Sequence, residues 1–196
     1  IAVYWMGDDI AHIMVSFGFE GDQVAVSIET RKEQGEAYST LAGFFRQYEL
    51  YYVVADERDV IDLRTSYREP PEDVYVFRVQ ARDDAAGKAK IRAFFLDYMA
   101  QVNALKAAPQ WYNTLTTNCT TNVVSHVHAI GGTLPLNWEA LLSGHFPHLI
   151  YQRGGFDQSM PYDELRAASL VNQAARAASG SSDFSRRIRE GLPGTE

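Results

Sequence analysis

The residue best suited to covalent chemistry is Cys119, the single cysteine of the chain, which lies in a run of threonines and asparagines at residues 114–122. Apolar residues follow it with the spacing of one helix face: Val123, Val124, Val127 and Ile130. A helix is therefore predicted to begin near the cysteine. Its predicted N-cap is Thr117 or Asn118, because a short side-chain oxygen can accept a hydrogen bond from a free amide at a helix start.

A cysteine in the first turn of a helix is surrounded by unpaired N–H groups and by the positive end of the helix dipole, both of which favour a thiolate. The same amides, at Asn118, Cys119 and Thr120, can stabilise an oxyanion during acyl transfer. A lone cysteine is more often a buried, unreactive residue. The polar residues on both sides of Cys119 favour a nucleophile instead.

A base for this nucleophile is predicted in the first hairpin. Residues 10–19 and 23–30 alternate like two antiparallel strands joined by a tight turn. The pairing can bring His12 and Glu29 into one cleft, as a base and the carboxylate that orients it. Considered alone, His12 is more typical of a structural histidine, and Glu29 is more typical of a solvated carboxylate at the end of a strand. Ser27 lies on the same strand face as Glu29 and is the alternative third residue.

Periodicity and turn residues predict the remaining elements. We expect strands at the first residues and at 49–55 and 73–80, and helices at 39–45, 85–107, 137–142 and 161–178. Residues 56–59 are interpreted as a solvated charge cluster, and His145 and His148 as loop residues. His126 and His128 are expected to pack or to face solvent. Phe184, Ile188 and Leu192 are expected to dock the C-terminal tail.

The composition favours one α+β domain over residues 1–196, with a helical segment at about 161–196 packed on it. No apolar run is long enough to span a bilayer. The chain does not open on methionine, which suggests an excised domain or a trimmed precursor. Residues 1–80 carry 7 Lys+Arg against 15 Asp+Glu, and this acidic half argues against nucleic-acid binding. No metal-ligand cluster or phosphate-binding glycine loop is present, so we expect no metal and no cofactor.

Several segments of the chain together resemble the Lnb N-terminal periplasmic domain family. They are His12–Phe19, Ser27–Glu36, Phe45–Leu50, Asp56–Asp59, Trp111–Asn113 through Cys119–Thr121, and the tail Asp183–Gly194. Their order is also similar to that of circularly permuted papain-like (NlpC-like) enzymes, in which a histidine strand precedes the cysteine helix. This resemblance implies a small antiparallel sheet packed against that helix, with His12 as the base, Cys119 as the nucleophile and Glu29 as the third residue.

The resemblance implies a periplasmic lipoprotein N-acyltransferase. Such an enzyme moves a fatty acyl chain from a phospholipid, through a cysteine thioester, to the α-amine of a diacylated lipoprotein. A membrane surface is then an expected partner, and tethering segments would lie outside this chain. The alternatives are a cysteine peptidase or amidase acting on cell-wall peptides, and a non-catalytic periplasmic assembly module. Candidate substrate-lining residues are Trp111, Tyr112, Arg31 and Arg46.

Overall fold

The computed structural model describes residues 1–6, 9–31 and 48–194. Its strands are β1 (Ala2–Met6), β2 (Ala11–Gly18), β3 (Gln23–Arg31), β4 (Glu49–Asp56) and β5 (Val74–Phe77). They form an antiparallel sheet in the order β4-β3-β2-β1-β5. This small antiparallel sheet with surrounding helices confirms the predicted α+β class.

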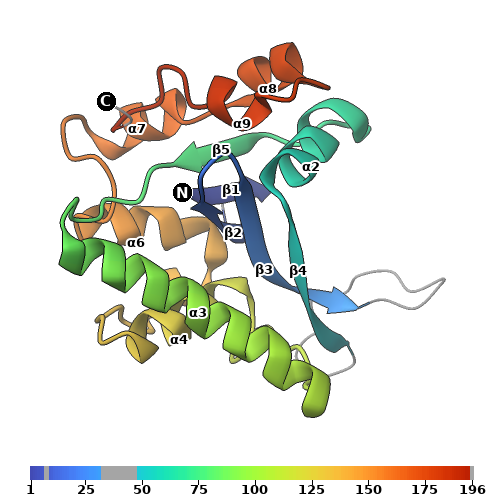
Figure 1. Ribbon diagram of the computed structural model, residues 1–196, viewed down its shortest axis with the longest axis vertical. Helices are drawn as coiled ribbons and strands as arrows, with labels where there is room; N and C mark the ends of the chain where they lie inside the picture. Colours follow the sequence, from blue (N-terminus) through green and yellow to red (C-terminus); the bar gives the residue numbers. More distant parts are fainter. Residues whose placement is uncertain (7–8, 32–47, 195–196) are drawn as a thin grey trace.

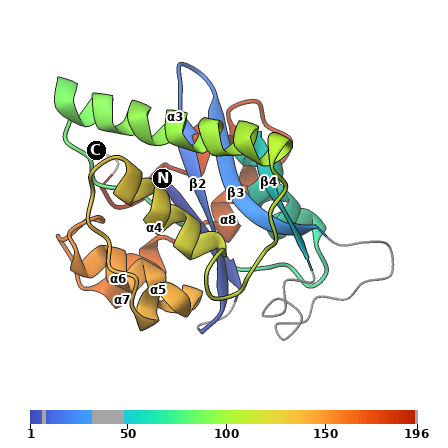
Figure 2. The same ribbon diagram turned by 90° about the horizontal axis from the view of Figure 1, so that it is seen from below.

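Helices cover both faces of the sheet (Figure 1). They are α2 (Glu57–Asp62), the π-helix η1 (Leu63–Tyr67), α3 (Ala85–Ala107), α4 (Cys119–Ala129), α5 (Trp138–Leu141), the 3-10 helix η2 (Ser143–His145), α6 (Phe146–Gln152), α7 (Tyr162–Ala168), α8 (Asn172–Ala178) and α9 (Phe184–Arg187). One face packs against α3, α4 and α6, and the other against α2, α8 and α9. Figure 2 shows α3 and α4 together on their side of the sheet.

The central strand β2 is buried on both of its faces. Ile13, Val15 and Phe17 belong to the core shared with α3, α4 and α6. Met14 points to the opposite core, beneath α2 and α8. Because side chains alternate along a strand, covering both sheet faces buries all of residues 13–17 in β2.

The predicted helix at 161–178 is instead two helices, α7 and α8. Between them Leu170 forms an isolated antiparallel bridge with Tyr75, and the Val171 amide donates to the Val74 carbonyl at 2.9 Å. The chain leaves the helix here because its backbone pairs with the edge strand β5. An alanine-rich pattern does not reveal this tertiary pairing.

The predicted solvated cluster at 56–59 is correct for Arg58 and Asp59, which form an exposed ion pair, and wrong for Glu57. Asp56 caps α2 by accepting from the Arg58 amide at 2.8 Å. Glu57 is fully buried, where it accepts two hydrogen bonds from Arg189, at 2.6 and 2.7 Å, and one from Ser16. The tail that supplies Arg189 therefore packs on the sheet.

The expected docking of the tail is confirmed, since Phe184, Ile188 and Leu192 are buried in the core with α2 and α8. His145 and His148 are not loop residues: His145 ends η2, and His148 lies within α6. The predicted helix at 39–45 lies outside the described residues.

Candidate active site

The start of α4 is fixed by Asn118, which confirms one of the two predicted caps. Its Oδ1 accepts from the amides of Thr120, at 3.0 Å, and Thr121, at 2.8 Å. The Asn118 amide in turn donates to Thr121 Oγ1 at 2.8 Å, which completes a capping box. Cys119 is therefore the first residue of α4, as the sequence predicted.

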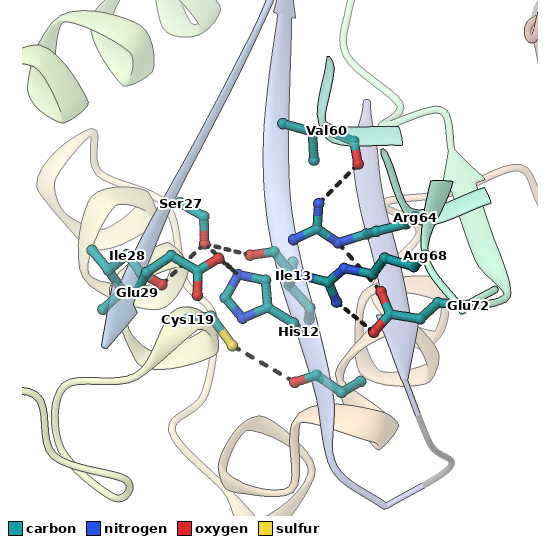
Figure 3. A network of polar contacts seen from close by, with 11 residues as sticks. His12, Ile13, Ser27, Ile28, Glu29, Val60, Arg64, Arg68, Glu72 and Cys119 are labelled. Atoms are coloured by element: carbon teal, nitrogen blue, oxygen red, sulfur yellow. Dashed lines mark hydrogen bonds and ion pairs between the residues drawn. The ribbon is translucent and has the colours of Figure 1, made fainter. Parts of the chain in front are cut away.

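The β2–β3 hairpin opens into a fork at the site. From the turn, the two strands pair between Gly18–Gln23 and Val15–Val26, and the pairing ends at Val15–Val26. They separate toward His12 and Glu29 (Figure 3). In the fork, Ser27 Oγ donates to the Ile13 carbonyl at 2.8 Å, so a side chain replaces the missing backbone pairing. The cysteine reaches the same region, since its Sγ lies 3.8 Å from the Ala11 carbonyl.

His12 joins the predicted partners into one cluster. Its Nε2 lies 2.9 Å from Glu29 Oε1 and 3.0 Å from Ser27 Oγ. The Cys119 side chain lies beside the same imidazole (Figure 3) and raises its pKa. The structure thus brings Cys119, His12 and Glu29 together, and it adds Ser27 as a second neighbour of Nε2. Because Nε2 is engaged, Nδ1 is the ring nitrogen left to exchange a proton with sulfur.

The cluster favours a charged imidazole. Burial by itself lowers the pKa of His12, but Cys119 and Glu29 outweigh it and raise this pKa to about 9. For Glu29, burial raises the pKa, while His12, Arg64 and Arg68 act in the other direction and lower it overall. The carboxylate and the imidazolium therefore stabilise each other.

Cys119 and His12 lie in a cavity of about 380 Å³. Its lining residues are Trp5, Ile10, Ala11, His12, Ile28, Glu29, Thr30, Arg64, Arg68, Glu72, Tyr112, Thr114, Leu115, Asn118, Cys119, Leu141, Leu142 and Ser143. Cys119 is only 5% exposed, although polar residues flank it in the sequence. The sulfur lies in the wall of an open cavity rather than in the hydrophobic core.

Two of the three predicted oxyanion donors are engaged elsewhere. The Thr120 amide is held by Asn118 Oδ1, and the Asn118 amide by Thr121 Oγ1. Asn118 therefore serves as the cap, and the amides of Asn118 and Thr120 are not available as donors to a ligand. The Cys119 amide has no hydrogen-bond partner among the described residues and is the donor that remains.

Of the four candidate substrate-lining residues, only one lines the described cavity. Tyr112 lines the cavity. Trp111 is half exposed and bridges to Glu49 in the sheet, outside the described cavity lining. Arg31 forms an exposed ion pair with Glu49 at 2.7 Å. Arg46 lies outside the described residues.

Most of the lining was not singled out from the sequence, including Trp5, Arg64 and Arg68. The two arginines are four residues apart, Arg64 within η1 and Arg68 directly after it. His126 is buried against Tyr98, with its Nδ1 2.6 Å from Asp97, and does not line this cavity, in agreement with its expected packing role.

These features define an α+β protein with a buried Cys–His–Glu cluster at the fork of its sheet. A sequence model of the Lnb N-terminal periplasmic domain matches residues 1–152. The protein belongs to this family, as the motifs indicated. The match includes Cys119, His12 and Glu29 and ends with α6. Searches among curated proteins and solved structures found no match to the chain.

Proposed function

We propose that the domain is a thiol-dependent acyltransferase. It moves a fatty acyl chain from a phospholipid to the α-amine of the lipid-modified N-terminal cysteine of a diacylated lipoprotein. The observation that carries the proposal is the contact of Cys119, at a helix start, with an imidazole that Glu29 holds in place. Membership of a periplasmic domain family supports the cellular setting.

In the first half-reaction, the Cys119 thiolate attacks the ester carbonyl of the phospholipid, and an S–C bond forms. The Cys119 amide donates to the developing oxyanion. When the C–O bond of the ester breaks, imidazolium Nδ1–H of His12 protonates the leaving glycerol oxygen. The products are a lysophospholipid and an acyl thioester on Cys119, with His12 neutral.

In the second half-reaction, the lipoprotein amine attacks the thioester carbonyl. Neutral His12 accepts the proton of the amine, an amide bond forms, and the C–S bond breaks. The thiolate and the imidazolium return to their starting charges. Glu29 stays ionised in both halves and stabilises the imidazolium, and Ser27 helps to fix the orientation of the ring.

The proposal includes a circularly permuted papain-like arrangement. The histidine strand β2 precedes the cysteine helix α4 in the chain, and α4 begins where β2 and β3 separate. This order supports the expected permutation, because the base and its carboxylate come from the first hairpin and the nucleophile from a later helix.

The lining of the cavity supports a lipid substrate over a cell-wall peptide. Apolar side chains line much of it, among them Ile10, Leu115, Leu141 and Leu142. Such a wall accommodates an acyl chain, whereas a peptidase or amidase would need polar partners for peptide groups. A non-catalytic assembly module would need no contact between Cys119 and His12, so that contact weighs against it.

The test uses the purified protein, phosphatidylglycerol in detergent micelles and a synthetic diacylated lipopeptide. We expect intact-mass spectrometry to find one acyl group on the wild-type protein, labile to hydroxylamine, and N-acylated lipopeptide as the product. Cys119→Ser should lower the transfer rate by roughly 10³-fold or more, because a serine hydroxyl is not ionised at neutral pH.

Normal transfer by Cys119→Ser would refute the thioester route. Release of free fatty acid without N-acylation of the lipopeptide would instead favour the hydrolytic alternative.

A further inference from the structure

Two arginines share the cavity of Cys119. Arg64 comes from η1 and Arg68 follows its last turn, and both side chains line the cavity. In Figure 3 they lie on one side of His12, with Cys119 on the other. A π-helical turn is uncommon and is often found at functional sites. The turn here presents Arg64 toward the cavity.

The Arg64 side chain is held as a rigid plane. It is only 9% exposed, and its Nη1 donates to the Val60 carbonyl at 2.8 Å. Its Cζ lies 3.7 Å from the centre of the Trp5 ring, and that ring lies 4.7 Å from the imidazole of His12. One indole thus separates the guanidinium from the proposed base, and the arginine has little freedom to leave.

The counter-charge of these arginines is incomplete. Glu72 forms ion pairs with both arginines: its Oε1 lies 2.7 Å from Arg68 Nη1, and its Oε2 lies 3.6 Å from Arg64 Nε, a distance too long for a hydrogen bond. Glu72 Oε2 and Arg64 Nε are both buried without a hydrogen-bond partner among the described residues. Glu29, the other nearby carboxylate, is engaged by His12. The two guanidinium groups therefore share Glu72 as their ion-pair partner, and the nearby Glu29 is shared with His12.

The pKa of Arg64 is lowered by its surroundings. Burial and the neighbouring Arg68 lower the pKa of Arg64 to about 10, although Glu29, Glu72 and Tyr51 oppose the shift. A buried cation with too little counter-charge gains most from an anion that enters the cavity. A planar guanidinium is well suited to phosphate, because its N–H groups can bond two oxygens at once.

We propose that Arg64 and Arg68 bind the phosphodiester of the phospholipid whose ester Cys119 attacks. The inference rests on the proposed function, which already names a phospholipid donor, and it assigns the residues that hold the phosphate of that donor. One glycerol unit joins the ester to the phosphate, and Cys119 and the two arginines line the same cavity. Arg64 provides the fixed contact, and the more exposed Arg68 provides a second charge.

The experiment compares two donors with identical acyl chains, phosphatidylglycerol and diacylglycerol, in mixed micelles with the diacylated lipopeptide. We expect the wild-type protein to prefer phosphatidylglycerol by about 10-fold or more. Arg64→Gln should lower the rate with phosphatidylglycerol by about the same factor and leave the rate with diacylglycerol nearly unchanged. Arg64→Lys, which keeps the charge without the fork, should be intermediate.

Arg58→Gln is the matched control. Arg58 lies on the preceding helix α2, forms an exposed pair with Asp59 and does not line the cavity. It should leave the donor preference unchanged. Circular dichroism of each variant confirms that it is folded.

Equal loss with both donors would overturn the inference, because it would show that Arg64 only supports Glu29 or the fold. Absence of a donor preference in the wild-type protein would overturn it too. If the protein releases fatty acid but acylates no lipopeptide, the proposed function fails while the donor preference still tests Arg64.

Binding provides a readout that needs no reaction. Isothermal titration calorimetry of dihexanoylphosphatidylglycerol against Cys119→Ala should show about 10-fold weaker binding once Arg64→Gln is added. Unchanged binding would overturn the inference whether or not the protein is an acyltransferase.

Discussion

The imidazole of His12 is the residue on which the proposed chemistry depends. Its Nε2 is held by Glu29 and Ser27, and its ring is flanked by Trp5. These contacts fix the imidazole ring in one orientation, in which Nδ1 is the nitrogen that can exchange a proton with the Cys119 sulfur. The sequence left two candidates for the orienting residue, Glu29 and Ser27, and the structure uses both: the carboxylate supplies charge, and the hydroxyl links the ring to the fork of the strands.

His12 also makes stability depend on pH. Its pKa is about 9 in the folded protein, against an ordinary value of 6.5, so folding favours the protonated ring. The resulting stabilisation is fully present below pH 6.5 and is lost as the pH rises through 9. Relative to His12→Gln, the wild-type free energy of unfolding should therefore fall by roughly 1–3 kcal/mol between about pH 6 and about pH 9.5.

Urea denaturation of both proteins at the two pH values measures this difference. The subtraction removes groups that titrate in both proteins, such as the Ile1 amino group, whose pKa is lowered. Equal pH dependence of the two proteins would contradict the raised pKa of His12.

At the scale of elements, the site requires a helix start and a strand fork to meet. The capping box of α4 fixes the first turn, and the early end of the β2–β3 ladder opens the place where Cys119 can lie beside Ala11 and His12. Neither element forms the cluster alone. A capped helix provides the free amide, and the fork provides the imidazole and the carboxylate.

Removal of the cap should therefore affect both stability and reactivity. We expect Asn118→Ala to lower the free energy of unfolding by about 1 kcal/mol, because two amides lose their acceptor. It should also slow alkylation of Cys119 by iodoacetamide at pH values where the folded fraction is unchanged. Denaturation curves and the alkylation rate followed by mass spectrometry measure the two effects.

Asp84→Ala is the matched control, since Asp84 caps α3 by accepting from the Gly87 amide at 2.7 Å. It should cost similar stability and leave Cys119 alkylation unchanged. If both variants alter alkylation equally, the cap of α4 has no special role in positioning the sulfur.

At the scale of the whole molecule, the mouth of the cavity is bordered by exposed apolar side chains. Ile10, Leu115 and Leu142 line the cavity and yet are 50%, 47% and 42% exposed. None of the described helices is long and apolar enough to cross a bilayer. Because these exposed apolar side chains line the cavity, we expect them, for the proposed donor, to contact the lipid surface from which the substrate enters.

Charged substitutions at this mouth should weaken membrane contact. Ile10→Asp and Leu142→Asp should each lower binding to phosphatidylglycerol vesicles by roughly 10-fold or more, because each removes a large apolar contact. Co-sedimentation with vesicles measures the bound fraction. Leu96→Asp is the control, because Leu96 is 52% exposed on α3 and does not line the cavity. Equal loss in all three variants would point to net charge rather than to the mouth.

The sequence by itself determined the local features: the hairpin, the long helix α3, a cap at Thr117 or Asn118 and the placement of Cys119 in a first turn. These depend on short-range periodicity and on side-chain hydrogen bonds within a few residues, so the chain carries them in consecutive positions. The family motifs added the pairing of His12 with Cys119, 107 positions apart.

Only the tertiary structure decided which distant side chains meet. It buried Glu57 against Arg189, split α7 from α8 at the edge of β5, and engaged the Thr120 amide that had been expected to serve an oxyanion. It also brought Arg64 beside Trp5 in the cavity. Such contacts depend on which sheet face is covered and where a ladder ends, and these are properties of the packed molecule that no local pattern encodes.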